Sequence, residues 1–142
     1  MTKVDFYILQ DHARGDRYQL ACRVTEKARQ AGRRIVIHCQ SSEEAAHIDR
    51  LLWTFWDQRF IPHGRIGEAD PAINPILIGD GREAIEEQGV LVNLAETVPT
   101  FFGRFERLVE CMDHDPVVKA AGRERFRYYR EHGYALDTHL IQ

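Results

Sequence analysis

The sequence predicts a doubly wound α/β fold, in which a mostly parallel sheet carries helices on both faces. Short apolar runs rich in β-branched residues alternate with segments of helical periodicity. Such alternation is typical of parallel sheets that are covered on both sides. The chain has 142 residues, a length that suits one core. We therefore expect residues 1–142 to form a single domain.

The chain is expected to begin with a strand followed by a helix. Residues 4–9 (VDFYIL) form a short β-rich apolar run. Residues 16–31 then place apolar side chains at helical spacing, and Gly32 is suited to end that helix. A strand followed by a helix is the first half of a parallel crossover unit.

A second strand and helix are predicted next. Residues 34–39 (RIVIHC) form another short run with β-branched residues. The following helix begins where Ser41 and Glu44 have the spacing of a capping box. We expect this helix to run through Trp53.

The middle of the chain predicts two more buried strands, at residues 76–78 and 90–94. A short acidic helical piece is expected between them, at residues 84–88. Residues 100–112 carry apolar side chains at helical spacing, which predicts a helix that packs on the sheet.

A second helix near the C-terminus has clearer sequence signals at both of its ends. Asp115 is suited to cap its N-terminus, Pro116 to its first turn, and Gly133 to its C-terminal cap. With the helix at 100–112, the chain is thus expected to close with two consecutive helices.

Charge and composition argue against several classes of protein. There are 19 basic and 22 acidic residues, and a net charge of −3 disfavours a protein whose main partner is a nucleic-acid backbone. The apolar run near the N-terminus is too short for a signal peptide or a membrane span, so we expect a cytoplasmic protein without a membrane partner. Cys22, Cys39 and Cys111 are odd in number and far apart, which suggests neither disulfides nor a zinc site.

The turn after the first strand does not have the pattern of a nucleotide-binding loop. A phosphate cradle needs several glycines there, so that backbone amides can approach the anion. This chain offers only Gly15, between the carboxylates of Asp11 and Asp16. We therefore expect no glycine loop and no cofactor.

Cys39 is the one candidate nucleophile, because it ends a predicted strand just before a helix. Its surroundings partly resemble a phosphatase loop, yet Ala45 stands where an arginine would be needed, and Glu43 and Glu44 would repel an anion. A buried structural cysteine is the interpretation we favour. The histidines form no pair at metal-binding helical spacing and no serine lies in a GxSxG motif, so no metal site and no catalytic residue is predicted.

The last predicted helix concentrates positive charge on one side. Its cations at one-turn spacing are Lys119, Arg123, Arg127 and Arg130. They border a narrower face that includes the ring of Phe126. One interpretation is a solvated helix face, and the other is a site for a short acidic peptide with an apolar anchor. The pattern by itself leaves both open.

Aromatic residues also gather at 51–64 (LLWTFWDQRFIPHG), where two tryptophans and two phenylalanines lie close together. Part of this cluster must belong to the core. Trp and Phe also anchor protein interfaces, so exposed rings here would indicate a partner surface.

Three segments together resemble the chi subunit of bacterial DNA polymerase III holoenzyme: VDFYIL, LLW followed by FIPHG, and RERFRYYREHGYALDTH. The resemblance implies a Rossmann-like fold without nucleotide chemistry, in a non-catalytic accessory subunit of the clamp-loader complex that acts in DNA replication. It also implies two protein partners, the psi subunit and the acidic C-terminal tail of single-stranded DNA-binding protein, which combines aspartates with Pro-Phe. DNA would be contacted only indirectly.

The resemblance assigns residues to both surfaces. Lys119, Arg123 and Arg127 match the family's basic tail-binding positions, and Arg123 is expected to grip the carboxylate at the end of the tail. Phe126 matches an aromatic position beside them, and Met112 matches a position suited to line the phenylalanine pocket.

Trp53 and Phe60 match the aromatic positions that contact psi, which favours the interface interpretation of that cluster. The alternative function is a small nucleotide- or phosphate-dependent enzyme that uses the crevice at the C-terminal ends of the strands, with Cys39 or Asp11 as the working group. Direct binding of single-stranded DNA by the basic helix is a third hypothesis, weakened by the negative net charge and the lack of evident stacking platforms.

Overall fold

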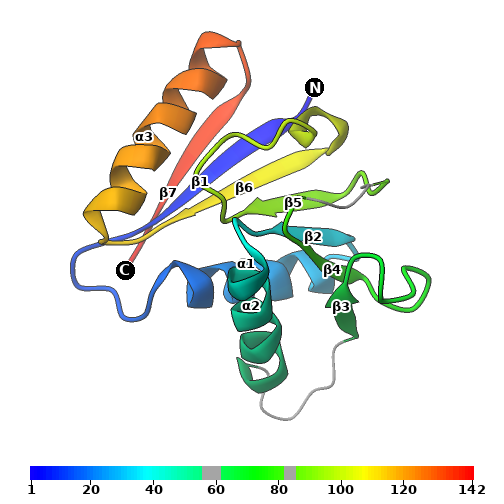
Figure 1. The fold of residues 1–142 in the computed structure, drawn as a ribbon. Helices are drawn as coiled ribbons and strands as arrows, with labels where there is room; N and C mark the ends of the chain where they lie inside the picture. Colours follow the sequence, from blue (N-terminus) through cyan, green and yellow to red (C-terminus); the bar gives the residue numbers. More distant parts are fainter. Residues whose placement is uncertain (56–61, 82–85) are drawn as a thin grey trace.

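A seven-stranded sheet runs through the computed structural model, which describes residues 1–55, 62–81 and 86–142 (Figure 1). Every neighbouring pair of strands is parallel, so the predicted α/β class with a parallel sheet is confirmed. In the order in which they pair, the strands are β3 (His63–Arg65), β4 (Ile76–Gly79), β2 (Ile35–His38), β5 (Val90–Asn93), β6 (Arg107–Met112), β1 (Lys3–Leu9) and β7 (Leu136–Ile141).

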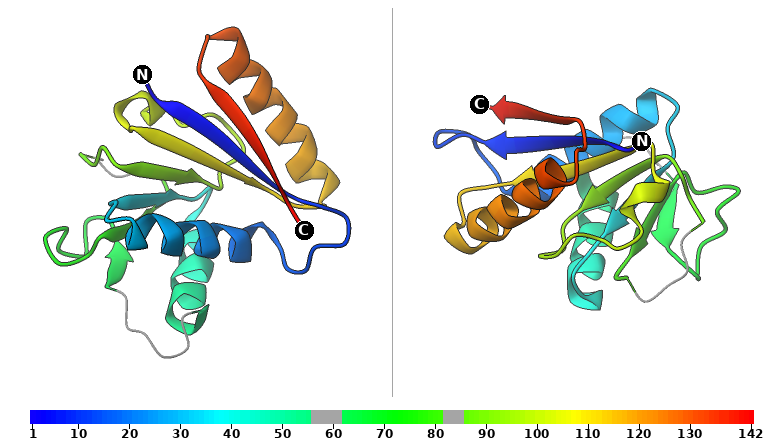
Figure 2. Two further views of the ribbon diagram at one scale, coloured as in Figure 1. Left: turned by 180° about the vertical axis from the view of Figure 1, so that it is seen from behind. Right: turned by 90° about the horizontal axis from the view of Figure 1, so that it is seen from above.

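Helices cover both faces of this sheet (Figures 1 and 2). Helices α1 (Arg17–Gln30) and α2 (Ser42–Phe55) pack together on one face, and α3 (Pro116–Glu131) lies against the other. No helix in the described ranges is long and apolar enough to cross a membrane.

The ends of α1 and α3 agree with the prediction and have clear local causes. The carboxylate of Asp16 accepts hydrogen bonds from the backbone N–H groups of Tyr18 and Gln19 in α1, and that of Asp115 accepts one from Val117 in α3. These groups have no partner within the helix, so the caps stabilise both starts. Gly32 and Gly133 follow the last turns with φ of 79° and 77°, a conformation that glycine adopts without strain.

The predicted helix at residues 100–112 is wrong. The segment contains a short 3₁₀ turn, η1 (Phe102–Arg104), and then strand β6, which pairs with β5 on one side and β1 on the other. Both faces of this inner strand are covered, so its residues from Leu108 to Met112 are all buried. A short run of consecutive buried residues fits a buried helix as well as it fits an inner strand.

Besides β6, two further strands were not predicted. β3 has only three residues, and β7 lies at the edge of the sheet with half of its side chains exposed. The chain therefore closes with β6, α3 and β7, and not with two helices. The helical piece predicted at 84–88 begins outside the described residues, and residues 86–88 have no regular secondary structure.

Successive residues of each strand point to opposite faces and build two separate cores. Ile35 and Ile37 of β2 pack under α1 and α2, while Val36 between them belongs to the core on the α3 side. The same alternation places Phe6 of β1 and Met112 of β6 under α3. The side chains of β1 and β6 that point toward α3 are therefore the ones that can line a groove beneath that helix.

Candidate functional site

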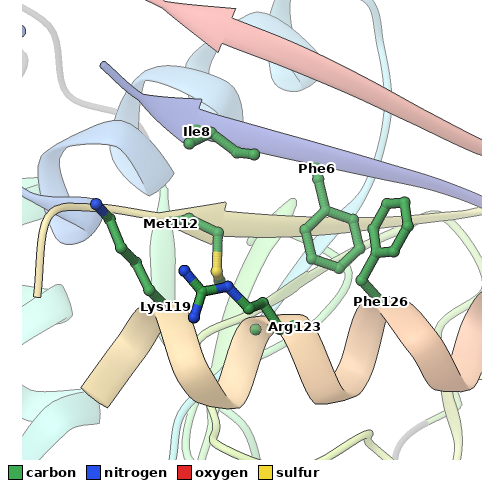
Figure 3. Close-up of a pocket in the computed structure, with 7 residues that line it drawn as sticks. Phe6, Ile8, Met112, Lys119, Arg123 and Phe126 are labelled. Carbon is green, nitrogen blue, oxygen red and sulfur yellow. The ribbon is translucent and has the colours of Figure 1, made fainter. Parts of the chain in front are cut away.

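A groove of about 320 Å³ lies between α3 and the C-terminal halves of β1 and β6 (Figure 3). Its apolar lining comes from Phe6 and Ile8 of β1, Met112 of β6 and Phe126 of α3. The rings of Phe6 and Phe126 meet edge to face with their centroids 5.2 Å apart. This geometry leaves an apolar slot of the kind that receives an aromatic or aliphatic side chain.

Two cations of α3 line the same groove. Lys119 and Arg123 are one turn apart, and Figure 3 shows both side chains beside the slot. Neither forms an ion pair with any residue in the described part of the chain. Charges held without a partner at the border of apolar surface favour a ligand that combines carboxylates with an apolar anchor.

Gly122 of α3 faces Met112 of β6 at the floor of this groove. A Cβ atom at position 122 would collide with Sδ of Met112, so a larger residue would require that flexible side chain to move. The observed position of the Met112 side chain therefore depends on glycine at position 122.

A buried polar network fixes α3 to the sheet next to the groove. The Glu110 carboxylate is fully buried and accepts hydrogen bonds from Arg125 Nε at 3.0 Å, Tyr129 Oη at 2.7 Å and Asn93 Nδ2 at 3.1 Å. Arg125 also donates to the backbone oxygen of Glu96 at 2.7 Å. Burial raises the pKa of Glu110, and Arg125 and the other donors oppose that rise.

Sequence reasoning missed this network, although one signal was present. Arg125 lies next to Tyr129 and Gly122 on the helical wheel, on the side of α3 that faces the sheet. A charged residue at such a position needs a buried partner. Nothing in the local pattern identifies Glu110 as that partner, because the spacing of apolar residues around Glu110 predicts a helix and not an inner strand.

The structure brings four of the five predicted tail-site residues together: Met112, Lys119, Arg123 and Phe126. The fifth, Arg127, does not line the groove, and its guanidinium pairs with Glu124 at 3.3 Å on the exposed side of α3. Phe6 and Ile8 complete the groove and were not predicted.

The second predicted surface is described only in part. Trp53 is 54% exposed near the end of α2, and its ring packs on His63 of β3 with centroids 4.6 Å apart. A large apolar ring that remains half exposed is available to a protein partner. Phe60, the other predicted residue of this surface, lies outside the described residues.

The crevice required by the enzyme hypothesis measures about 270 Å³ and lies at the C-terminal ends of β2 and β5. The described residues that line it include Asp80 and no lysine or arginine. Cys39 is fully buried there, and its burial and the charge of Glu44 raise the pKa of its thiol. A protonated thiol is a weak nucleophile at neutral pH. Among the described residues, no His, Cys, Asp and Glu side chains gather into a group that could hold a metal ion.

Comparison with known proteins identifies the family. The model of the family described as DNA polymerase III chi subunit, HolC, matches residues 1–137. A DNA polymerase III subunit chi from Pseudomonas aeruginosa is 37% identical over 141 residues, covering 99% of this chain and 98% of the relative. Subunits of the same name from Haemophilus influenzae and Escherichia coli are 30% and 26% identical, and the alignments cover at least 95% of each chain.

Chi is an accessory subunit of the replicative DNA polymerase III and not its catalytic subunit. The family match covers all the elements that build the groove, from β1 to α3. The chain belongs to the DNA polymerase III chi subunit family.

Proposed function

We propose that this chain is a cytoplasmic adaptor of the clamp-loader complex, which joins the psi subunit to the acidic C-terminal tail of single-stranded DNA-binding protein. The observation that carries the proposal is the groove under α3, where an apolar slot is bordered by the cations Lys119 and Arg123. An adaptor of this kind contacts DNA only through the proteins that it binds. Many tails on one coated strand would raise its effective affinity.

Each part of the tail has a matching feature in the groove. The terminal phenylalanine fits the slot between Phe6, Phe126 and Met112, where an edge-to-face ring contact adds about 0.5–1.5 kcal/mol beyond burial of its area. The terminal carboxylate fits the guanidinium of Arg123, which can hold it with two parallel hydrogen bonds. Lys119 serves the preceding aspartates, and Arg127 extends the positive charge along the exposed side of α3.

The proposal is tested by titrating the chain with a fluorescent peptide that ends in Asp-Ile-Pro-Phe, at low and at moderate salt. We expect salt-sensitive binding of micromolar order, because few charged contacts and one apolar anchor dominate. Arg123→Ala should weaken binding by about tenfold or more, since a lost charge-assisted hydrogen bond is worth roughly 1.5–3 kcal/mol.

Arg130→Ala is the matched control for this titration. Arg130 belongs to the same row of cations on α3 but is exposed and does not line the groove. The control should bind within about twofold of the wild type, because a distant surface charge is screened. Equal affinity of the Arg123→Ala variant and the wild type would show that the tail binds elsewhere.

The psi surface is tested separately. Trp53→Ala should reduce co-purification with the psi subunit, because an exposed tryptophan typically anchors an interface, and its removal costs about 2 kcal/mol or more. Its affinity for the tail peptide should not change. Ile73→Ala, which removes an apolar side chain that is 67% exposed, is the control for general surface effects. Undiminished psi binding by the Trp53 variant would exclude this surface.

A further inference from the structure

A second pocket lies on the opposite face of β1, between α1 and the β1–β7 edge of the sheet. Its volume is about 140 Å³. Alternation along β1 separates it from the groove, because Phe6 and Ile8 point toward α3 whereas Tyr7 lines the second pocket. The two sites therefore lie back to back across one strand.

The rim of this pocket is positive. Arg23 and Lys27 are exposed, stand one turn apart on α1, and have no ion pair within the described ranges. Their like charges repel each other across one turn of the helix, and a bound anion would relieve that repulsion. Arg107 adds a fixed guanidinium, held by Asp5 at 2.6 Å and by Tyr7 Oη at 2.7 Å.

The floor of the pocket is apolar. Leu20 and Val24 of α1 and Ile141 of β7 line it. A phosphate backbone would use the cations but would leave this floor exposed to water. A peptide that carries an apolar side chain among carboxylates satisfies both the rim and the floor.

We propose that this pocket is a second binding site for an acidic peptide, one that inserts an apolar side chain between α1 and β7. One chain then holds two acidic peptides at once, on opposite faces of β1. This inference rests on Arg23, Lys27 and the apolar floor, and not on the groove under α3.

The test is a titration of the methyl-labelled chain with the blocked peptide acetyl-Asp-Asp-Leu-Asp-Asp-amide, followed by NMR. The methyl signals of Leu20, Val24 and Ile141 report the second pocket, and those of Ile8 and Met112 report the groove. We expect saturable, salt-sensitive shifts of the second-pocket signals in the wild type. The same shifts should persist in the Arg123→Ala variant, in which the groove is weakened.

Charge variants locate the site. Arg23→Ala combined with Lys27→Ala should weaken the second-pocket titration by about tenfold or more, because two charge-assisted contacts are lost. Arg14→Ala combined with Arg29→Ala is the matched control, since it removes the same charge from positions that do not line the pocket. Equal weakening by both pairs would reduce the effect to net charge and overturn the proposal.

Two further outcomes would also overturn it. If only the Ile8 and Met112 signals move, or if Arg123→Ala abolishes every shift, the chain has one peptide site and the adaptor function still stands. If an oligothymidylate moves the second-pocket signals and the peptide does not, the ligand is nucleic acid.

Discussion

The carboxylate of Glu110 illustrates how single residues control the position of the groove. It is fully buried in β6, and Arg125 of α3, itself only 4% exposed, pairs with it. A buried ion pair of this kind adds little net stability over an apolar pair, but the loss of one partner leaves the other charge buried without compensation. The pair therefore ties α3 to one position on the sheet.

Glu110→Gln should lower the free energy of unfolding by about 3–5 kcal/mol, because Arg125 would keep its charge in the interior. Equilibrium unfolding in urea measures this change. Glu124→Gln is the control, since it breaks an exposed pair with Arg127 and should cost about 0–1 kcal/mol. Similar losses in both variants would mean that the Glu110 network does not hold α3.

At the scale of elements, the approach of α3 to β6 defines the groove. The prediction located this helix correctly from Asp115, Pro116 and Gly133, because capping residues act locally. It did not indicate how close the helix comes to the sheet. In the structure, the Met112 side chain occupies the space that a Cβ at position 122 would take.

Gly122→Ala should therefore change binding more than stability. Alanine improves helix propensity by about 1 kcal/mol, which offsets the displacement of the flexible Met112 side chain. The displaced thioether would fill part of the groove and weaken binding of the Asp-Ile-Pro-Phe peptide by roughly fivefold, or about 1 kcal/mol.

Peptide titration and urea unfolding of the same preparation separate these two effects. Ala120→Ser, on the exposed side of α3, should leave peptide affinity unchanged. Full affinity in the Gly122→Ala variant would show that the tail does not reach Met112.

The wrong prediction of a helix at residues 100–112 has its cause in how secondary-structure elements pack together. Phe105, Leu108 and Met112 fit one helical stripe. β6 is nevertheless a strand, because its backbone pairs with β5 on one side and with β1 on the other. Local periodicity describes which residues are buried. For a short segment that is buried on both faces, it does not distinguish a helix from a strand.

At the scale of the whole molecule, Asp5 joins segments that are far apart in the sequence. It is 2% exposed in β1 and accepts hydrogen bonds from Arg107 Nε of β6 at 2.6 Å and, at 2.9 Å, from His139 Nε2 of β7 when that nitrogen is protonated. Burial alone would raise the pKa of Asp5. The hydrogen bonds and charge of Arg107, with His139 and Lys3, outweigh burial and lower that pKa below its ordinary value of 3.8.

This lowered pKa makes the stability of the sheet edge pH-dependent. The ionised form of Asp5 favours the folded state, so its contribution is present above pH 3.8 and is lost as the pH falls through the lower folded-state pKa. Asp5→Asn should reduce the free energy of unfolding at pH 7 by about 2 kcal/mol, the worth of a hydrogen bond to a charged group.

The difference between this variant and the wild type should shrink as the pH falls from 3.8 toward the lower folded-state pKa, because the unfolded chain binds a proton at Asp5 before the folded chain does. Urea unfolding at a series of pH values measures it. Asp137→Asn, which breaks an exposed pair with Lys3, should have little effect at any pH. A difference that stays constant through the acid range would contradict the role of ionised Asp5.

Local patterns in the amino-acid sequence were enough to predict the fold class, the ends of α1 and α3, and three α3 residues that line the groove: Lys119, Arg123 and Phe126. Capping, helical periodicity and the clustering of cations are local properties, so the order of residues is sufficient to reveal them. Met112 was predicted only through the family resemblance. The folded chain was needed to establish that β6 is a strand, that Glu110 pairs with Arg125, and that Phe6 and Ile8 complete the groove. The physical reason is that strand pairing brings together residues about a hundred positions apart, and no local pattern specifies which segments will pair.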